Sequence, residues 1–205
     1  LRMKIICIGR NYTDHIEELK NEKPTDPVIF IKPDSSVLKN GHDFYIPDFS
    51  DDVHYEVEVL VKINKVGKFI EQKFAHKYYE EVGLGIDFTA RDVQAKLKEK
   101  GLPWEKAKGF DGASVIGKWI DKTKLPSINN IDFSLIKNEE VAQNANTSLM
   151  LWKVDELISY ISTYFTLKIG DIIFTGTPAG VGKVVSNDKL EGFLNQQKMF
   201  SIKVK

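Results

Sequence analysis

The alternation of polar and apolar residues is most regular at positions 54–63, which read HYEVEVLVKI. A period of two is typical of a β-strand that buries one face. The apolar face of this strand is predicted to hold Tyr55, Val57, Val59, Val61 and Ile63. Glu56 and Glu58 then project from the opposite face with His54, and their carboxylates lie about 7 Å apart. Like charges this close repel each other, so water or a cation is expected between them.

Apolar runs bounded by turn residues predict further strands. These runs cover residues 4–8, 27–32, 81–87, 171–174 and 200–204. No internal repeat and no Pro/Ser-rich linker interrupts the chain, so we expect a single domain over residues 1–205. Leu1 and Arg2 precede the first methionine, Met3, and are set aside as an expected expression remnant. The fold class predicted is α+β and β-rich.

Three short helices are predicted, at residues 13–20, 89–100 and 154–165. Thr13 and Thr89 are candidate N-caps, because a threonine hydroxyl can accept a hydrogen bond from a free amide of the first turn. Gly101 follows the second helix and can adopt the positive φ that ends a helix. The third helix is predicted from apolar residues that recur with the 3.6-residue period.

Composition and charge narrow the possible partners. The 205 residues are 42% hydrophobic and 28% charged, as in soluble globular proteins. Basic and acidic residues cancel at 29 each, which gives no electrostatic reason to expect nucleic acid or an anionic membrane as a partner. No apolar run approaches the ~18 residues of a transmembrane helix. The single cysteine, Cys7, is expected to be a buried, reduced thiol, consistent with a cytoplasmic protein.

The glycine-rich segment GTPAGVGK, residues 176–183, invites comparison with a phosphate-binding loop. A P-loop has four residues between its first glycine and the Gly-Lys pair, whereas five separate Gly176 from Gly182. Val184 follows Lys183 and offers no hydroxyl for magnesium. A turn-rich loop after a strand is therefore favoured over a nucleotide site.

Three acidic residues form a candidate metal site. Glu56 and Glu58 alone fit a solvated strand face, but Asp87 ends an apolar strand just before a predicted helix. Asp87 could instead help to cap that helix. Three carboxylates from two strands would suit a hard cation such as Mg²⁺, Mn²⁺ or Ca²⁺. No Cys/His cluster in the sequence offers a zinc site.

His15 and Glu18 are three residues apart and share one face of the first predicted helix. The carboxylate can orient the imidazole and raise its basicity, as a general base requires. An ordinary polar pair on a surface helix explains the same spacing. Arg91, Gln94 and Lys108 could bind a carboxylate, although solvated positions explain them equally well.

Six stretches, in order along residues 3–205, resemble the fumarylacetoacetate hydrolase family. They are GRNYTDHIEEL (9–19), PVIFIKP (27–33), HYEVEVLV (54–61), DFTARDVQ (87–94), KGLPWEKAKGFD (100–111) and GDIIFTGTPAGVG (170–182). The KGLPW block resembles the acylpyruvase and oxaloacetate decarboxylase branch. The resemblance implies a mixed β-sandwich roll with a few short helices, assembled as a homodimer. Residues 1–205 show no counterpart of the N-terminal domain of longer members, so a protein other than fumarylacetoacetate hydrolase proper is expected.

The resemblance also implies roles for particular residues. Glu56, Glu58 and Asp87 match the positions that bind a divalent cation, Mg²⁺ or Mn²⁺, in the family. His15 and Glu18 match its water-activating pair.

Further matches concern the substrate. Lys108 is predicted as a catalytic residue that offsets negative charge, and Arg91, Gln94 and Thr177 are predicted to bind the substrate. These matches lead to the hypothesis of a metal-dependent enzyme that cleaves a C–C bond in a 2-oxo acid. The reaction would be acylpyruvate hydrolysis, oxaloacetate decarboxylation or both, through a metal-stabilised pyruvate enolate. Two alternatives stay open at this point: an isomerase, hydratase or decarboxylase of dienedioates from aromatic catabolism, and a non-catalytic β-rich binding protein.

Overall fold

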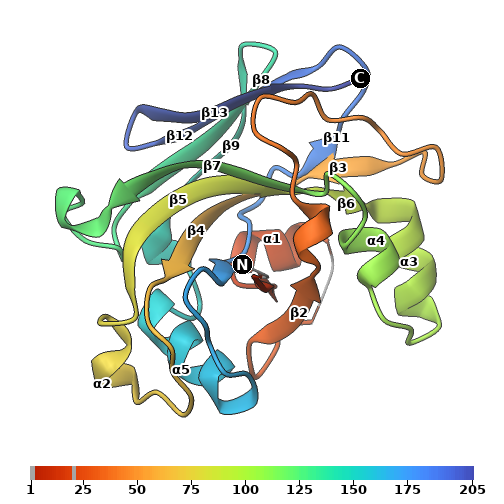
Figure 1. Ribbon diagram of the computed structural model, residues 1–205. Helices are drawn as coiled ribbons and strands as arrows, with labels where there is room; N and C mark the ends of the chain where they lie inside the picture. The colour runs from red at the N-terminus through yellow and green to blue at the C-terminus, as the bar shows by residue number, and fades with distance from the viewer. Residues whose placement is uncertain (1–2, 20–21) are drawn as a thin grey trace.

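The computed structural model describes residues 3–19 and 22–205, and its central element is a six-stranded sheet (Figure 1). The strand order is β2-β1-β10-β4-β5-β7. The strands are β1 (Ile5–Gly9), β2 (Val28–Lys32), β4 (Val57–Ile63), β5 (Tyr79–Asp87), β7 (Ser114–Asp121) and β10 (Ile172–Phe174). β1 pairs with β10 in parallel, and the other neighbours pair antiparallel. The sheet is therefore mixed.

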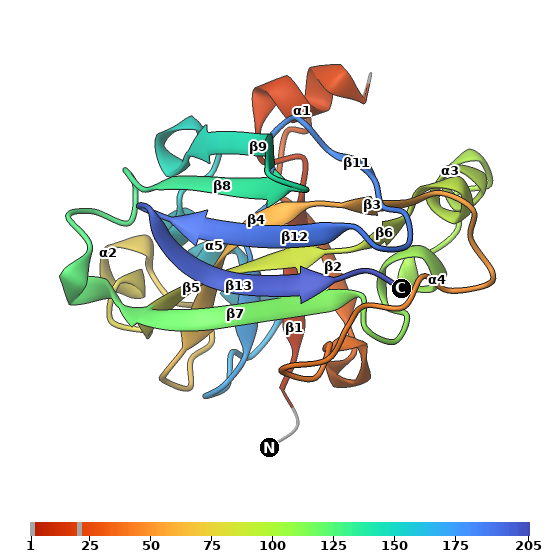
Figure 2. The same ribbon diagram turned by 90° about the horizontal axis from the view of Figure 1, so that it is seen from above.

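Two smaller sheets complete the β-structure. A four-stranded sheet has the order β13-β12-β8-β9 and lies over β4 and β5 when seen from above (Figure 2). Its strands are β8 (Asp132–Lys137), β9 (Glu140–Asn146), β12 (Lys189–Leu194) and β13 (Gln197–Lys203). A three-stranded sheet joins β11 (Gly182–Lys183), β3 (Val53–Tyr55) and β6 (Thr89–Ala90).

Five short α-helices are described in residues 3–19 and 22–205. They are α1 (Thr13–Glu18), α2 (Gln72–Ala75), α3 (Arg91–Glu99), α4 (Glu105–Lys108) and α5 (Val154–Tyr164). Single 3-10 turns occur at Asp34–Ser36, Lys122–Lys124 and Thr147–Leu149. At the start of α5, the Glu156 carboxylate accepts a hydrogen bond from the Lys153 backbone N–H (2.7 Å), which satisfies a free amide there. Among the described residues, no helix combines the length and apolar character needed to cross a membrane.

The main apolar core lies between the central sheet, the four-stranded sheet and α5. Val59 and Leu84 from the central sheet, Leu135 and Leu190 from the four-stranded sheet and Ile158 from α5 belong to one buried cluster. Burying such side chains contributes about 1.5–3 kcal/mol each. The predicted β-rich α+β fold, a mixed sandwich roll with few helices, is confirmed.

The predicted strand at 54–63 is broken at Glu56, which corrects the sequence interpretation. Residues before the break form β3, whose His54 pairs with Thr89 and Lys183. Residues after it form β4, which pairs with β5 and β10. The face that carries Glu58 is also buried, because the next residue on it, Leu60, is fully enclosed in a second apolar cluster.

Two predicted helix caps are wrong. The first helix begins at Thr13, so its N-cap is Tyr12, and the second begins at Arg91 after Ala90. Thr89 belongs instead to β6. Gly101 does follow the second helix with φ +62°, as predicted. The first helix ends at Glu18 with Leu19 as its C-cap, short of the predicted end, and Lys20 lies outside the described residues.

Candidate metal centre and catalytic pocket

Three carboxylates meet where β5 ends and β4 begins. Glu56 directly precedes β4, Glu58 lies in β4 and Asp87 ends β5. The two strands are antiparallel neighbours, and the Asp87 backbone N–H donates to the Glu56 carbonyl (2.8 Å). Each carboxylate offers one oxygen, and these oxygens lie within 4.8 Å of one another. The three residues are 5%, 2% and 0% exposed, which excludes the solvated strand face considered from the sequence.

Three cationic side chains surround this triad. Lys32 donates to Asp87 Oδ1 (2.6 Å) and to the Ala113 carbonyl (2.7 Å). Lys108 donates to Glu56 Oε2 (2.8 Å) and Asp87 Oδ2 (2.7 Å). The Asp87 carboxylate is thus directed at two lysines, and the alternative in which it caps α3 is wrong.

Arg91 is the third cation, and it lies at the start of α3. Its Nη2 donates to Glu56 Oε1 (2.5 Å), and its Nη1 donates to Gln94 Oε1 (2.8 Å). Gln94 lies one turn further along the same helix, which explains how the two side chains meet. The guanidinium is therefore held between an acid and an amide at the pocket wall.

The charges of the triad shift its pKa values in opposite directions. Burial acts to raise the pKa of Glu56, but Lys108 and Arg91 outweigh it and hold that pKa well below its usual range. Burial, together with the negative charges of Asp87 and Glu56, raises the pKa of Glu58 well above its usual range. Burial acts to lower the pKa of Lys108, but Asp87 and Glu56 raise it above its usual range.

The donor set fits a hard divalent cation. All three ligand groups are carboxylates, whose oxygens suit Mg²⁺ and Mn²⁺ better than soft metals. A cation here would also offset the repulsion that raises the pKa of Glu58. The Glu58 carboxylate is already oriented, because Oε2 accepts a hydrogen bond from the Gly176 backbone N–H (2.7 Å).

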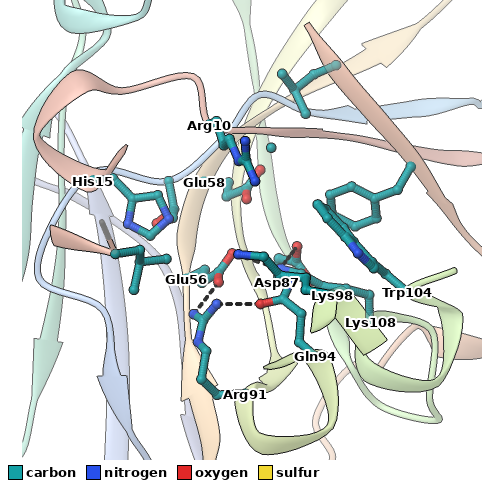
Figure 3. A pocket seen from close by; sticks show the side chains of 15 residues that line it. Arg10, His15, Glu56, Glu58, Asp87, Arg91, Gln94, Lys98, Trp104 and Lys108 are labelled. Carbon is teal, nitrogen blue, oxygen red and sulfur yellow. Dashed lines mark hydrogen bonds and ion pairs between the residues drawn. The ribbon is translucent and has the colours of Figure 1, made fainter. Parts of the chain in front are cut away.

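His15 lies across the pocket from Lys108 (Figure 3). His15 Nδ1 lies 3.2 Å from Glu18 Oε2, and Glu18 Oε1 accepts a hydrogen bond from the Gly180 backbone N–H (3.0 Å). His15 is buried, so the surface-helix alternative is wrong for this residue. Burial lowers the pKa of the imidazole, and the nearby carboxylates of Glu56 and Glu18 offset this only in part. The ring is therefore mainly neutral at pH 7.

The glycine-rich loop contacts the acidic residues of this site through its backbone amides. Gly176 and Gly180 both have positive φ, at +100° and +96°. Their amides bind the protein's own carboxylates, Glu58 and Glu18, which is a structural use of the loop rather than a phosphate cradle. At Gly180, an added Cβ would lie 2.4 Å from the Ala142 carbonyl oxygen, so glycine is required by space as well as by φ.

All of the predicted site residues except Glu18 line one pocket, and Glu18 contacts the imidazole of His15. The lining residues predicted from the sequence are His15, Glu56, Glu58, Asp87, Arg91, Gln94, Lys108 and Thr177. The Thr177 hydroxyl donates to the Val57 carbonyl (2.9 Å) and accepts from Gln143 Nε2 (2.9 Å). The Thr177 hydroxyl therefore uses its one hydrogen in the bond to the backbone.

Sequence reasoning missed several residues of the site. Lys32 is fully buried beside Asp87, and its only sequence signal is a lysine at the end of the apolar run PVIFIK. Gln143 supports Thr177 from β9, and the alternating polar sequence there gives no signal for it. Arg10, Lys98 and the aromatic rings of Phe30 and Trp104 also line the pocket.

A β-roll with a buried carboxylate triad and a facing His–Glu pair defines a domain suited to divalent-cation chemistry. The chain belongs to the fumarylacetoacetate hydrolase family: the family described as fumarylacetoacetate (FAA) hydrolase C-terminal matches residues 4–205. The family resemblance found in the sequence is confirmed.

Three relatives illustrate this membership. The chain is 43% identical over 182 residues to the mitochondrial oxaloacetate decarboxylase of Dictyostelium discoideum, covering 88% of this chain and 84% of that protein. It is 38% identical over 187 residues to the mitochondrial oxaloacetate tautomerase of Bos taurus, covering 91% and 85%. The crystal structure of fumarylpyruvate hydrolase from Pseudomonas aeruginosa in complex with Mn²⁺ and pyruvate matches with a TM-score of 0.93 at 31% identity, covering 99% and 89%. All three are named as enzymes, which confirms the prediction of an enzyme.

Proposed function

We propose that this protein is a divalent-metal-dependent enzyme that cleaves a C–C bond in a 2-oxo acid. Its reactions would be decarboxylation of oxaloacetate, hydrolysis of acylpyruvates or both. The observation that carries the proposal is the buried triad of Glu56, Glu58 and Asp87, with ligand oxygens within 4.8 Å of one another. The names of the relatives support this substrate class, since oxaloacetate and fumarylpyruvate are both 2-oxo acids with a second carbonyl group.

The triad would hold Mg²⁺ or Mn²⁺, and the Mn²⁺ in the fumarylpyruvate hydrolase structure supports a divalent cation. A bound cation of this kind supplies a Lewis acid that draws electron density from the 2-oxo group and stabilises negative charge there. Arg91, braced by Glu56 and Gln94, would fix the orientation of the substrate. Gln94 and Thr177 would complete the substrate contacts from the pocket wall.

His15 would act as the general base in acylpyruvate hydrolysis. Glu18 accepts the Nδ1–H, which leaves Nε2 as the basic nitrogen and fixes the ring. His15 then takes a proton from a water molecule as that water attacks the carbonyl beyond C3. The C3–C4 bond breaks, its electrons pass to the pyruvate enolate, and the acyl group leaves as a carboxylic acid.

Decarboxylation of oxaloacetate needs no attacking water. The C3–C4 bond breaks, CO₂ leaves, and the same enolate remains, to be protonated at C3. Lys108 is the catalytic residue that would offset the negative charge during this step, since it lines the pocket and its ammonium lies beside Glu56 and Asp87. His15 and Glu18 are therefore required for hydrolysis only.

The test compares acylpyruvate hydrolysis and oxaloacetate decarboxylation in the same preparation. Chelation with EDTA and Glu56→Ala are expected to abolish both reactions, and readdition of Mg²⁺ should restore the chelated enzyme. His15→Ala should lower hydrolysis by about 10²- to 10⁴-fold and spare decarboxylation. Glu80→Ala, an exposed acid on β5, is the matched control and should change neither. Unchanged turnover after chelation and in both site variants would refute the proposal.

Keto–enol tautomerisation of oxaloacetate is a second candidate reaction, favoured by the name of the Bos taurus relative. It would use the same polarised 2-oxo group but move a proton at C3 without breaking the C3–C4 bond. Enol absorbance and CO₂ release, followed together, separate the two reactions: a tautomerase changes the absorbance without releasing CO₂ faster than the uncatalysed rate.

Assembly as a homodimer is proposed from the family alone, and light scattering coupled to size exclusion would test it. The cytoplasmic location stays a prediction.

A further inference from the structure

The pocket has a second group of cations outside the triad. Arg10 lies directly after β1, and Lys98 lies in the last turn of α3, yet both line the same pocket (Figure 3). Lys98 is exposed and Arg10 is half-buried, whereas Glu56, Glu58 and Asp87 are buried. The two cations therefore lie at the mouth of the pocket, above its acidic floor.

Arg10 is held at the mouth by its own backbone. Its φ of +59° is uncommon for a residue with a side chain. The next residue, Asn11, is fully buried and fixes this turn, because its Nδ2 donates to the Thr175 and Trp152 carbonyls (2.8 and 3.1 Å). The guanidinium makes a long hydrogen bond of 3.4 Å from Nη1 to the carbonyl of Glu22. A constrained backbone that displays an arginine is a feature of functional sites.

The charges around the pocket are unevenly distributed. Lys32, Lys108 and Arg91 contact Glu56 and Asp87 directly, whereas Glu58 accepts a hydrogen bond from the Gly176 backbone. Arg10 and Lys98 add positive charge to the mouth of the same pocket. Loss of part of its hydration at the pocket wall lowers the pKa of Lys98, and the positive charges of Arg10 and Arg91 lower it further, so these cations repel one another. An anion bound between them would relieve this repulsion.

We propose that Arg10 and Lys98 form an anion subsite for the distal carboxylate of a substrate that has two carboxylates. The inference rests on the proposed function and narrows it: the preferred substrates are 2-oxo dicarboxylates, with the 2-oxo acid end at the triad and the second carboxylate at the mouth. Phe30 and Trp104, which also line the pocket, would flank the carbon chain between the two ends.

The test compares two acylpyruvates, one with a terminal carboxylate (fumarylpyruvate) and one without (acetylpyruvate). In Arg10→Gln and Lys98→Met, kcat/KM for fumarylpyruvate should fall about 3- to 10-fold each through KM, as expected for ion pairs at a solvent-accessible mouth. Acetylpyruvate should change less than about 2-fold. Lys98→Arg should restore the wild-type ratio. Lys96→Met, an exposed lysine of the same helix that does not line the pocket, is the matched control.

A binding measurement keeps this proposal separate from the proposed function. In the presence of Mg²⁺, calorimetry would compare pyruvate with the 2-oxo dicarboxylate 2-oxoglutarate. If the wild type neither hydrolyses the two acylpyruvates nor decarboxylates oxaloacetate, the proposed function is refuted. The anion subsite would then be supported by tighter binding of 2-oxoglutarate than of pyruvate, and by loss of that difference in both variants. Equal losses for both substrates, or no loss for fumarylpyruvate, would refute the anion subsite.

Discussion

Lys32 gives a sharp prediction, because it is a buried cation whose removal leaves a buried acid only partly compensated. Its ammonium is fully enclosed and contacts Asp87 Oδ1 and the Ala113 carbonyl. Lys32→Met keeps the apolar stem and removes the charge. Breaking a buried ion pair costs about 3–5 kcal/mol. Lys108 still contacts Asp87 Oδ2, so we expect a loss near the lower end, about 3 kcal/mol.

Such a loss is readily measured. In a chain of this size, 1 kcal/mol shifts the Tm by about 2–4 °C, so Lys32→Met should lower it by about 6–12 °C. Urea unfolding in EDTA would give the free energy of unfolding without any contribution from a bound cation. Lys62→Met is the matched control: its pair with Glu81 is half-exposed, and the change should cost less than about 1 kcal/mol.

The cost of removing Lys32 depends on its pairing with Asp87. If the cost comes from the uncompensated acid, the double variant Lys32→Met/Asp87→Asn should be more stable than Lys32→Met alone, because the buried negative charge is gone. A Lys32→Met protein within about 1 kcal/mol of wild type would contradict the argument. So would a double variant in which the two losses simply add.

Three further predictions concern His15, Glu18 and the glycine whose amide contacts Glu18. Glu18→Gln should lower acylpyruvate hydrolysis by about 10-fold or more and leave oxaloacetate decarboxylation intact, which parallel kinetic assays would show. Because burial lowers the pKa of His15 from its usual value near 6.5, hydrolysis should persist down to pH 6.5 and fall only below it as the base becomes protonated; a pH–rate profile whose acidic limb lies above pH 7 would contradict this. Gly180→Ala forces a Cβ to within 2.4 Å of the Ala142 carbonyl oxygen at φ +96°, so unfolding curves should show a loss of about 1–3 kcal/mol.

The sequence predicted the acids better than it predicted the backbone that carries them. Period-two alternation and an apolar run place Glu58 and Asp87 on strands, and antiparallel pairing of those strands brings the two together. The break at Glu56 could not be predicted, because it depends on distant partners: residues 89–90 and 182–183 pair with β3 and draw it into another sheet. The Thr89 cap failed for a similar reason, since pairing in β6 places Thr89 before the helix.

Supporting contacts were the part least accessible from the sequence. Lys32 ends an apolar run and so resembles an ordinary strand terminus. Its role could not be predicted, because its partner Asp87 is 55 residues away. The glycine-rich loop was correctly rejected as a P-loop, but its use was invisible in local sequence. Its amides reach Glu58 and Glu18 across separations of 118 and 162 residues. Local patterns identify groups able to do chemistry, whereas the residues that hold them in place are determined by the topology.

The ion pairs around the triad bear on how the protein acquires its cation. Glu56 and Asp87 each contact a cationic side chain, and Glu58 accepts a backbone amide. Two of the three acids of the triad are therefore paired with cations of the chain itself, in contrast to small domains that fold only when a metal binds. Folding and loading would be separate events, and the ion could exchange from the finished structure. The cellular supply of Mg²⁺ and Mn²⁺, rather than the folding step, would then select which ion works in the pocket.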